Sequence, residues 1–391
     1  MRDPFPTYRR MREEAAAHWS DANGGTWFIP RYKDVRDGFL DMRLSSSRKS
    51  GAAANQFPEH VRAEFESCQG VMREWLVLQD PPRHTPLRKL MSRGFVRPIL
   101  EGLRPRIQEV TDQLLDRAAS ESTINFVEAL ARPLPGQIVC DLLGVESSVQ
   151  DDFMRWSEDI VSFGGSLAPS VELFRRAMTS ILEMIAYFKE VVPQRRLEKG
   201  DDMISLLLRA EEAGDVVTTD QVLANCVQLV FAGHETTRNL LANGLYLLLT
   251  HPQALEDLRR DPALMPTAVL EFLRIESPLQ LIRRVVDVDM KWCGVDMKAG
   301  HGLVLMTGSA NRDPEAFDDP DRLDIRRAPV RQLAFGHGIH RCIGAELAAI
   351  ETEIGLNTVL RRFPGIGLAK AEPQRVMNPM LRGLSELAIH I

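Results

Sequence analysis

The sequence lacks the features that mark a secreted, disulfide-linked or membrane-spanning protein. Its five cysteines are odd in number, and none stands at the spacing of a CxxC pair. They therefore argue against a disulfide framework and indicate a reducing compartment. The N-terminal segment lacks the apolar core of a signal peptide, and no uncharged run reaches the roughly 18 residues that a membrane span needs. These absences predict a soluble, cytoplasmic protein that does not contact a membrane.

Excess basic charge and repeated sequence are also absent. The formal net charge is −6, and no basic segment is interleaved with aromatic residues, which argues against nucleic-acid binding. We find no internal repeat, low-complexity tract or linker. Length alone would allow more than one domain, but the economical interpretation is a single domain over residues 1–391. Hydrophobic residues make up 44% of the chain, enough for a large core.

Helical periodicity dominates the chain, and β-like alternation is confined to short stretches. Helices are expected over 32–40, from Thr85, and over 125–144, 151–163, 171–197, 218–250, 256–260 and 267–275. Short strands are expected near 26–30 and within 285–305, whereas 45–80 is interpreted as irregular and 311–332 as a structured meander. The centre of the longest helix, 227–232, is apolar on all sides and should be buried. The predicted fold class is mainly α with a small β component.

A lone cysteine, Cys342, lies between a glycine-rich loop and an apolar-periodic segment in the stretch LAFGHGIHRCIG. A helix should begin at or just after it. A sulfur there faces unpaired N–H groups and the positive end of the helix dipole, which lower the pKa of the thiol. Gly336, Gly338 and Gly344 leave room for a flat ligand against the backbone. A single unpaired thiolate suits one axial metal ligand; the alternative is a buried structural cysteine beside a turn.

This stretch resembles the haem-binding signature of the cytochrome P450 family, through Phe335, the following glycines, His340, Cys342 and Gly344. The resemblance implies that the Cys342 thiolate is the proximal ligand of the iron in haem b. It also implies that Phe335 packs beside the sulfur and that His340 reaches a haem propionate. The implied fold is a single-domain P450 fold, with the haem between the long buried helix and the helix after Cys342.

Residues 231–237, reading FAGHETT, place polar groups inside the long apolar helix. A charged residue beside a glycine contradicts local propensity, and such conflicts tend to mark function. Thr236 can donate its hydroxyl to the carbonyl of Ala232, which bends the helix and leaves room for a small ligand. The alternative is a polar cluster that fixes helix packing. A zinc site is excluded because Arg238 replaces the second histidine of HExxH.

The same stretch resembles the acid–alcohol pair of the family's oxygen-binding groove. By that resemblance Glu235 relays protons, and Thr236 stabilises the iron-bound peroxo species and its water.

Glu271 and Arg274 lie three residues apart on one predicted helix face. By itself this is a surface ion pair worth under about 1 kcal/mol. It resembles the family's buried Glu-x-x-Arg pair, which an arginine from a later meander joins. Arg322, in the sequence PDRL, supplies that position, although Leu323 stands where phenylalanine is usual. The implied role of the three charged residues is to hold the loop that carries Cys342.

His84 and Arg88 lie four residues apart on one predicted helix face. In the family such a pair meets the haem propionates together with a further arginine. Arg284 matches that arginine by its distance from Gly294, and Arg283 is the alternative. Paired cations suit a buried dianionic edge. The other interpretation is a solvated basic face.

The motifs occur in family order over nearly the whole chain. They imply a haem-thiolate monooxygenase that inserts one oxygen atom of O2 into an organic substrate by hydroxylation or epoxidation. The expected substrate is a small molecule or a carrier-protein-bound intermediate of secondary metabolism, such as a polyketide, peptide or terpene. One alternative is a haem-fold partner protein without oxygenase activity, whose relatives typically lose the cysteine or the acid–alcohol pair. The other is a peroxide-driven peroxygenase, whose relatives usually replace the acid–alcohol pair.

Electrons are expected to come from NAD(P)H through a separate ferredoxin reductase and ferredoxin, because 391 residues leave no room for a fused reductase beside a haem domain. The protein is expected to be a monomer. An acidic donor should meet the basic residues that border the cysteine side. These are Arg83, Arg88, Lys89, Arg93, Arg331 and Arg341.

Overall fold

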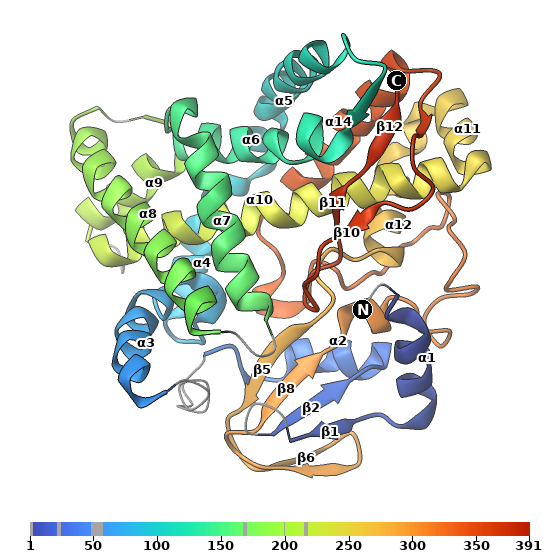
Figure 1. The fold of residues 1–391 in the computed structure, drawn as a ribbon. Helices are drawn as coiled ribbons and strands as arrows, with labels where there is room; N and C mark the ends of the chain where they lie inside the picture. The colour runs from blue at the N-terminus through green and yellow to red at the C-terminus, as the bar shows by residue number, and fades with distance from the viewer. Residues whose placement is uncertain (1–2, 22–24, 48–57, 167–169, 199, 215–217) are drawn as a thin grey trace.

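The computed structural model describes residues 3–21, 25–47, 58–166, 170–198, 200–214 and 218–391 (Figure 1). The fold is mainly helical with small sheets, as predicted. The helices are α1 Phe5–Glu14, α2 Tyr32–Leu40, α3 Glu59–Met72, α4 His84–Met91, α5 Arg97–Ala118, α6 Pro133–Leu143, α7 Gln150–Gly165, α8 Val171–Leu197, α9 Met203–Glu212, α10 Thr219–Thr250, α11 Pro252–Arg260, α12 Met265–Ile275, α13 Thr307–Ala310 and α14 Ala345–Arg362. Within the described residues, every helix is too short or too polar to cross a membrane.

The strands are short; β1, β2, β5, β6 and β8 lie at the bottom of Figure 1 beside α1 and α2, whereas β10, β11 and β12 lie higher, among the helices. The largest sheet has the order β1-β2-β8-β5-β3, in which only β2 and β8 run parallel. The strands are β1 His18–Ser20, β2 Thr26–Ile29, β3 Leu44–Ser45, β4 Thr123–Asn125, β5 Ile282–Val286, β6 Met290–Trp292, β7 Val295–Met297, β8 Gly302–Leu305, β9 Gly367–Leu368, β10 Gln374–Arg375, β11 Leu384–Glu386 and β12 Ala388–His390.

The longest helix, α10, runs through the middle of the fold (Figure 1). It begins with a capping box, in which the Thr218 hydroxyl accepts from the Gln221 backbone N–H and the Gln221 side chain accepts from the Thr218 N–H. Its first half packs in a hydrophobic cluster with α3, α4 and α6–α9, and its second half packs in a cluster with α5, α12 and α14. The two parts of the core are therefore joined through one helix.

One prediction about α10 needs correction. Val227 to Val230 are buried as expected, but Phe231 is only half-buried and Ala232 is exposed. Ala232 and Thr236 lie four residues apart, on a single helix face that remains accessible. The apolar sequence alone did not distinguish this face from the packed ones.

Further segments differ from prediction, and α1, α5 and α9 are helices where none was expected. Residues 45–80 contain helix α3, whose Val61, Phe65 and Met72 are buried against the core. Only these few apolar side chains carry the helical period, so it was missed. The helix expected over 125–144 is divided into β4, a wide helical turn over Val127–Ala131, and α6. The division falls at Pro133, which has no backbone N–H to continue the earlier turn.

Candidate functional site

The loop that carries Cys342 is fixed by backbone contacts on both sides. Gly336 and Gly338 have φ values of 69° and 70°, the left-handed region that favours glycine. A Cβ on Gly338 would lie 2.9 Å from the carbonyl oxygen of Phe39 in α2. The Cys342 N–H donates to the carbonyl of Phe335 at 2.8 Å, which closes the loop. The position of the sulfur is therefore set by the loop backbone.

Gly344 is the N-cap of α14, so the predicted helix begins at Ala345, shortly after Cys342. The prediction that the helix start lowers the pKa of the Cys342 thiol is wrong for the uncoordinated thiol. Cys342 is exposed, yet the density of protein atoms around its sulfur desolvates the thiolate, and this desolvation raises the pKa of the thiol. The Gly344 N–H, Arg88 and Arg341 lower the pKa but do not outweigh burial. A metal that binds the sulfur would have to displace its proton.

His84, His340 and Arg284 come together from α4, the Cys342 loop and β5. The rings of the two histidines lie 4.3 Å apart between centroids. Both ring nitrogens of His84 and Nε2 of His340 are buried and lack a hydrogen-bond partner within the described residues. Buried polar atoms rarely lack a hydrogen-bond partner. A neutral ring offers one N–H donor and a protonated ring offers two, so an anionic group could satisfy these atoms, and they fit the carboxylate edge of a haem.

The charges of this cluster agree with that fit. Burial lowers the pKa of His84, and it lowers the pKa of His340 to about 3, with the nearby Arg284 acting in the same direction. Burial also lowers the pKa of Arg284 to about 10, against the attraction of Asp80. The protonated form of each group is therefore disfavoured by desolvation. An anion bound here would favour protonation again.

The structure distinguishes Arg284 from Arg283. Neighbouring residues of a strand point to opposite faces, and Arg284 lies near His340 whereas Arg283 donates to the carbonyl of Ser166 at 3.2 Å. Nη2 of Arg88 donates to the carbonyl of Arg341 at 2.7 Å, and the binding of a propionate by its other nitrogens stays a prediction. Arg88 thus ties α4 to the residue that precedes Cys342.

The polar residues of α10 point in two directions. The Thr236 hydroxyl donates to the carbonyl of Ala232 at 2.9 Å, the bond expected from sequence. Glu235 is only 3% exposed, and its Oε1 accepts from Nη1 of Arg238 at 2.9 Å. The acid is therefore directed into the packed interior while the alcohol lies on the accessible face. Sequence reasoning did not assign Arg238 this role, although its i,i+3 spacing from Glu235 was the available signal.

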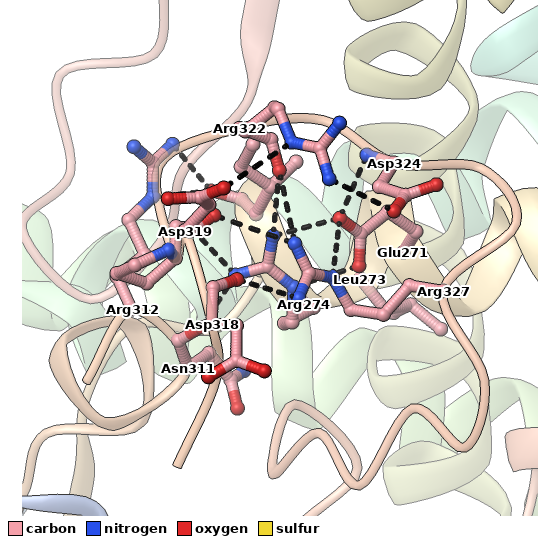
Figure 2. A network of polar contacts seen from close by, with 12 residues as sticks. Glu271, Leu273, Arg274, Asn311, Arg312, Asp318, Asp319, Arg322, Asp324 and Arg327 are labelled. Carbon is pink, nitrogen blue, oxygen red and sulfur yellow. Dashed lines mark hydrogen bonds and ion pairs between the residues drawn. The ribbon is translucent and has the colours of Figure 1, made fainter. Parts of the chain in front are cut away.

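Figure 2 shows the network around Glu271 and Arg274, both of whose side chains are fully buried. Nε and Nη2 of Arg274 each donate to one carboxylate oxygen of Glu271 at 2.7 Å. Arg274 also donates to the carbonyls of Asn311 at 2.9 Å and of Pro320 at 2.6 Å. The Asn311 side chain in turn accepts from the Leu333 N–H at 2.7 Å. The pair is thus connected to the start of the Cys342 loop.

The prediction that Arg322 contributes its charge to this network is wrong. Its side chain is 64% exposed and pairs with Asp319 and Asp324, and only its carbonyl accepts from Arg274. The third charged residue is Arg327, whose Nε lies 3.2 Å from Oε1 of Glu271. The chain turns back after Arg322, so a residue further along the meander reaches the carboxylate.

A family model described as Cytochrome P450 matches residues 51–384. The chain is 38% identical to cytochrome P450 107B1 of Saccharopolyspora erythraea, over 99% of this chain and 95% of the relative. It is 33% identical to 6-deoxyerythronolide B hydroxylase of the same organism, over 100% of this chain and 96% of the relative. The structure of P450BioI in complex with a hexadec-9Z-enoic acid ligated acyl carrier protein superposes with a TM-score of 0.91, at 31% identity, covering 100% of this chain and 98% of that one.

Proposed function

The chain belongs to the cytochrome P450 family and is a monooxygenase of that family, and we propose that Cys342 is its haem-iron ligand. The observation that supports this assignment is the group of unpartnered buried ring nitrogens beside the Cys342 loop, on His84 and His340, with the buried cation Arg284. They provide what a dianionic cofactor edge needs, at the place where the only thiol of the motif lies.

The residues present fit a haem, and each would hold a different part of it. Cys342 would coordinate the iron, and Phe335 would pack beside the sulfur. His84, His340 and Arg284 would bind the propionates by charge-assisted hydrogen bonds. When bound, the haem supplies the activation of O2 from which one oxygen atom passes to an organic substrate.

The chain's own contribution to the chemistry is proton handling on α10. The Thr236 hydroxyl uses its hydrogen on the Ala232 carbonyl, so its oxygen lone pairs remain to accept a hydrogen bond from water. Water held there would lie on the accessible face of α10. Glu235 would supply protons to that water, which requires its carboxyl group to leave the buried position beside Arg238. The acid and the alcohol thus have separate tasks: one carries the proton, and the other positions the water that receives it.

We propose that the substrate is a secondary metabolite, either free or bound to a carrier protein, and that the product is a hydroxylated or epoxidised compound. One relative is named 6-deoxyerythronolide B hydroxylase, and one solved relative is in complex with an acyl carrier protein bearing a fatty acid. These names support both forms of substrate without choosing between them. Electrons would come from NAD(P)H through a separate ferredoxin reductase and ferredoxin.

The test of the assignment is the Soret band of the reduced carbon monoxide complex. Cys342→Ser should abolish the thiolate-type band, because an alcohol oxygen does not replace the thiolate as a ligand. The matched controls Cys140→Ser, Cys226→Ser and Cys293→Ser remove the other thiols that the structure describes, all without disulfide partners, and should keep it. A thiolate-type band in Cys342→Ser would reject the assignment. Turnover with reduced ferredoxin compared with hydrogen peroxide then separates a monooxygenase from a peroxygenase, and no turnover with either would indicate a partner protein.

A further inference from the structure

Glu235 is the buried end of a row of charges that crosses from α10 to α7 and the start of α6. Nη1 of Arg238 lies 2.9 Å from Oε1 of Glu235 and 3.8 Å from Oε1 of Glu158 on α7. The same oxygen of Glu158 accepts from Nε of Arg132 at 2.7 Å. Nη1 of Arg238 therefore contacts the carboxylate of Glu235, and a small movement would bring it to the carboxylate of Glu158.

His234 also lies next to the carboxylate of Glu235. Its Nε2 lies 3.1 Å from the carbonyl oxygen of Arg132. A carbonyl only accepts, so Nε2 carries the hydrogen. Burial lowers the pKa of His234 to about 3, and Arg238 acts in the same direction, so the ring is neutral. Nδ1 is then an acceptor; it is buried, has no hydrogen-bond partner in the described part of the chain, and lies 3.6 Å from Oε1 of Glu235.

An acceptor nitrogen and a carboxylate oxygen cannot form a hydrogen bond with each other. A protonated carboxyl group can, because its O–H donates to Nδ1. Arg238 is thus a hydrogen-bond partner for the carboxylate form of Glu235, and His234 can be one for the carboxylic acid form. The approach of α10 to α6 that places His234 here is close: a Cβ on Gly233 would lie 2.8 Å from Cγ2 of Val139.

We propose that Glu235 exchanges partners when it takes up a proton. As a carboxylate it is held by Arg238; as a carboxylic acid it donates to Nδ1 of His234 while Arg238 turns to Glu158. The proton comes from solvent. The acid then leaves Nδ1 of His234 and gives the proton to water at Thr236, so Glu235 returns to the carboxylate beside Arg238 and no other group changes its charge. Arg238, His234 and Glu158 are positioning residues in this exchange. The inference deepens the proposed function, in which Glu235 is the proton donor.

The surrounding charges explain why Glu158 matters. The groups that surround Glu235 are His234 and Arg238 on α10, Glu158 on α7, and Arg132 before α6, which also lies 3.9 Å from Glu128. With Glu235 ionised, the two inner acids balance the two arginines. With Glu235 protonated, Glu158 alone must hold Arg238, which leaves one positive charge in excess. The side chain of Glu158 is 37% exposed, so water can help to screen that charge.

The exchange is tested by infrared spectroscopy of the haem-loaded protein at one mildly acidic pH. The band of a protonated carboxyl group that disappears in Glu235→Gln is assigned to Glu235. Arg238→Gln should increase this band, because the partner of the carboxylate is lost. Glu158→Gln should decrease it, because Arg238 loses its second partner and stays on Glu235. His234→Phe should also decrease it, because the acceptor for the acid is removed.

Glu128→Gln is the matched control, since Glu128 lies near Arg132 but makes no contact with Arg238 among the described interactions. It should leave the band unchanged.

Glu158→Gln is near-isosteric and partly exposed, so it keeps the proposal testable if Arg238→Gln fails to fold. An unchanged or increased band in Glu158→Gln, or one that falls equally in Glu128→Gln, would overturn the exchange. The infrared readout needs no turnover. If the infrared band changes as predicted but oxygenase activity is absent, the proposed function alone is rejected. If the thiolate Soret band and turnover are normal but the infrared band does not change as predicted, this inference alone is rejected.

Discussion

At the scale of single residues, Glu351 on α14 is a carboxyl group that folding removes from water without providing a partner. It is 3% exposed, and its Oε2 is buried with no hydrogen bond in the described structure. This burial raises the pKa of Glu351 from 4.5 to about 8. Between these values the folded state holds a proton that the unfolded state has released, so the free energy of unfolding falls as pH rises, by at most about 1.4 kcal/mol per pH unit.

Glu351→Gln should remove this contribution, because an amide does not ionise. The variant should therefore lose less stability than the parent protein between pH 5 and pH 8 (roughly the window between the two pKa values), as measured by denaturant unfolding across that range. Glu353→Gln is the control on the same helix, since Glu353 pairs with Arg104 at 3.3 Å, and it should keep the parent's pH dependence of stability near pH 8. Parallel pH profiles for the parent and Glu351→Gln would contradict the prediction.

Residue-level prediction from sequence succeeded where the chemistry is local. The hydrogen bond from Thr236 to the Ala232 carbonyl follows from a spacing of four on a helix, and the structure contains it. It failed where the partner is set by tertiary packing. Glu158 approaches Arg238 only because α7 crosses α10, and nothing in the intervening sequence indicates this pairing. The roles assigned to Cys342, Phe335 and the propionate ligands stay predictions until a haem is shown to bind them.

At the scale of elements, the Glu271–Arg274 pair holds the meander through Arg327, the backbone N–H of Asp324 and a set of carbonyls (Figure 2). Arg327 is 13% exposed in its side chain, contacts Glu271, and donates to the carbonyl of Asp318 at 2.7 Å. Arg327→Leu should destabilise the protein by about 3 kcal/mol, since it removes one partner of a buried charge, and should weaken haem retention because the meander leads into the Cys342 loop. Denaturant unfolding and the haem content after dialysis measure the two effects.

Arg322→Leu is the matched control for that substitution. Its guanidinium is largely exposed and pairs only with surface acids, so the change in stability should stay below about 1 kcal/mol. If Arg322→Leu were the more damaging variant, the sequence match to PDRL would be right and the observed pairing wrong.

Elements with a strong, uninterrupted period were predicted well from sequence. The bounds of α2 and α8 agree with the expected 32–40 and 171–197, and α10 differs from the expected 218–250 by one residue. Each has a clear end signal or a long apolar face. The strands near Gly294 and Gly300 were found because both glycines adopt positive φ at turns. Segments with sparse apolar residues, such as α3, were not found, because their burial depends on neighbours distant in sequence.

At the scale of the whole molecule, an acidic protein presents basic side chains around the Cys342 loop. Lys89, Arg93, Arg331 and Arg341 are exposed. Arg88 is half-buried and binds the carbonyl of Arg341, so it belongs to the loop's support. Arg83 pairs with Glu74, which offsets its charge. The remaining cations would attract an acidic electron donor and orient it toward the cysteine side.

Reduction by an acidic ferredoxin should therefore slow as ionic strength rises, because charges at the surface are screened over about 10 Å at 0.1 M salt. Lys89→Gln combined with Arg93→Gln should lower the rate at low salt and flatten its dependence on salt, since two of the steering charges are gone. Arg10→Gln on α1 removes an exposed cation that pairs with Glu14 and should change neither. Stopped-flow reduction with limiting donor measures the rates. A rate that does not vary with salt, or an equal loss in Arg10→Gln, would show that steering does not depend on the charges around the cysteine loop.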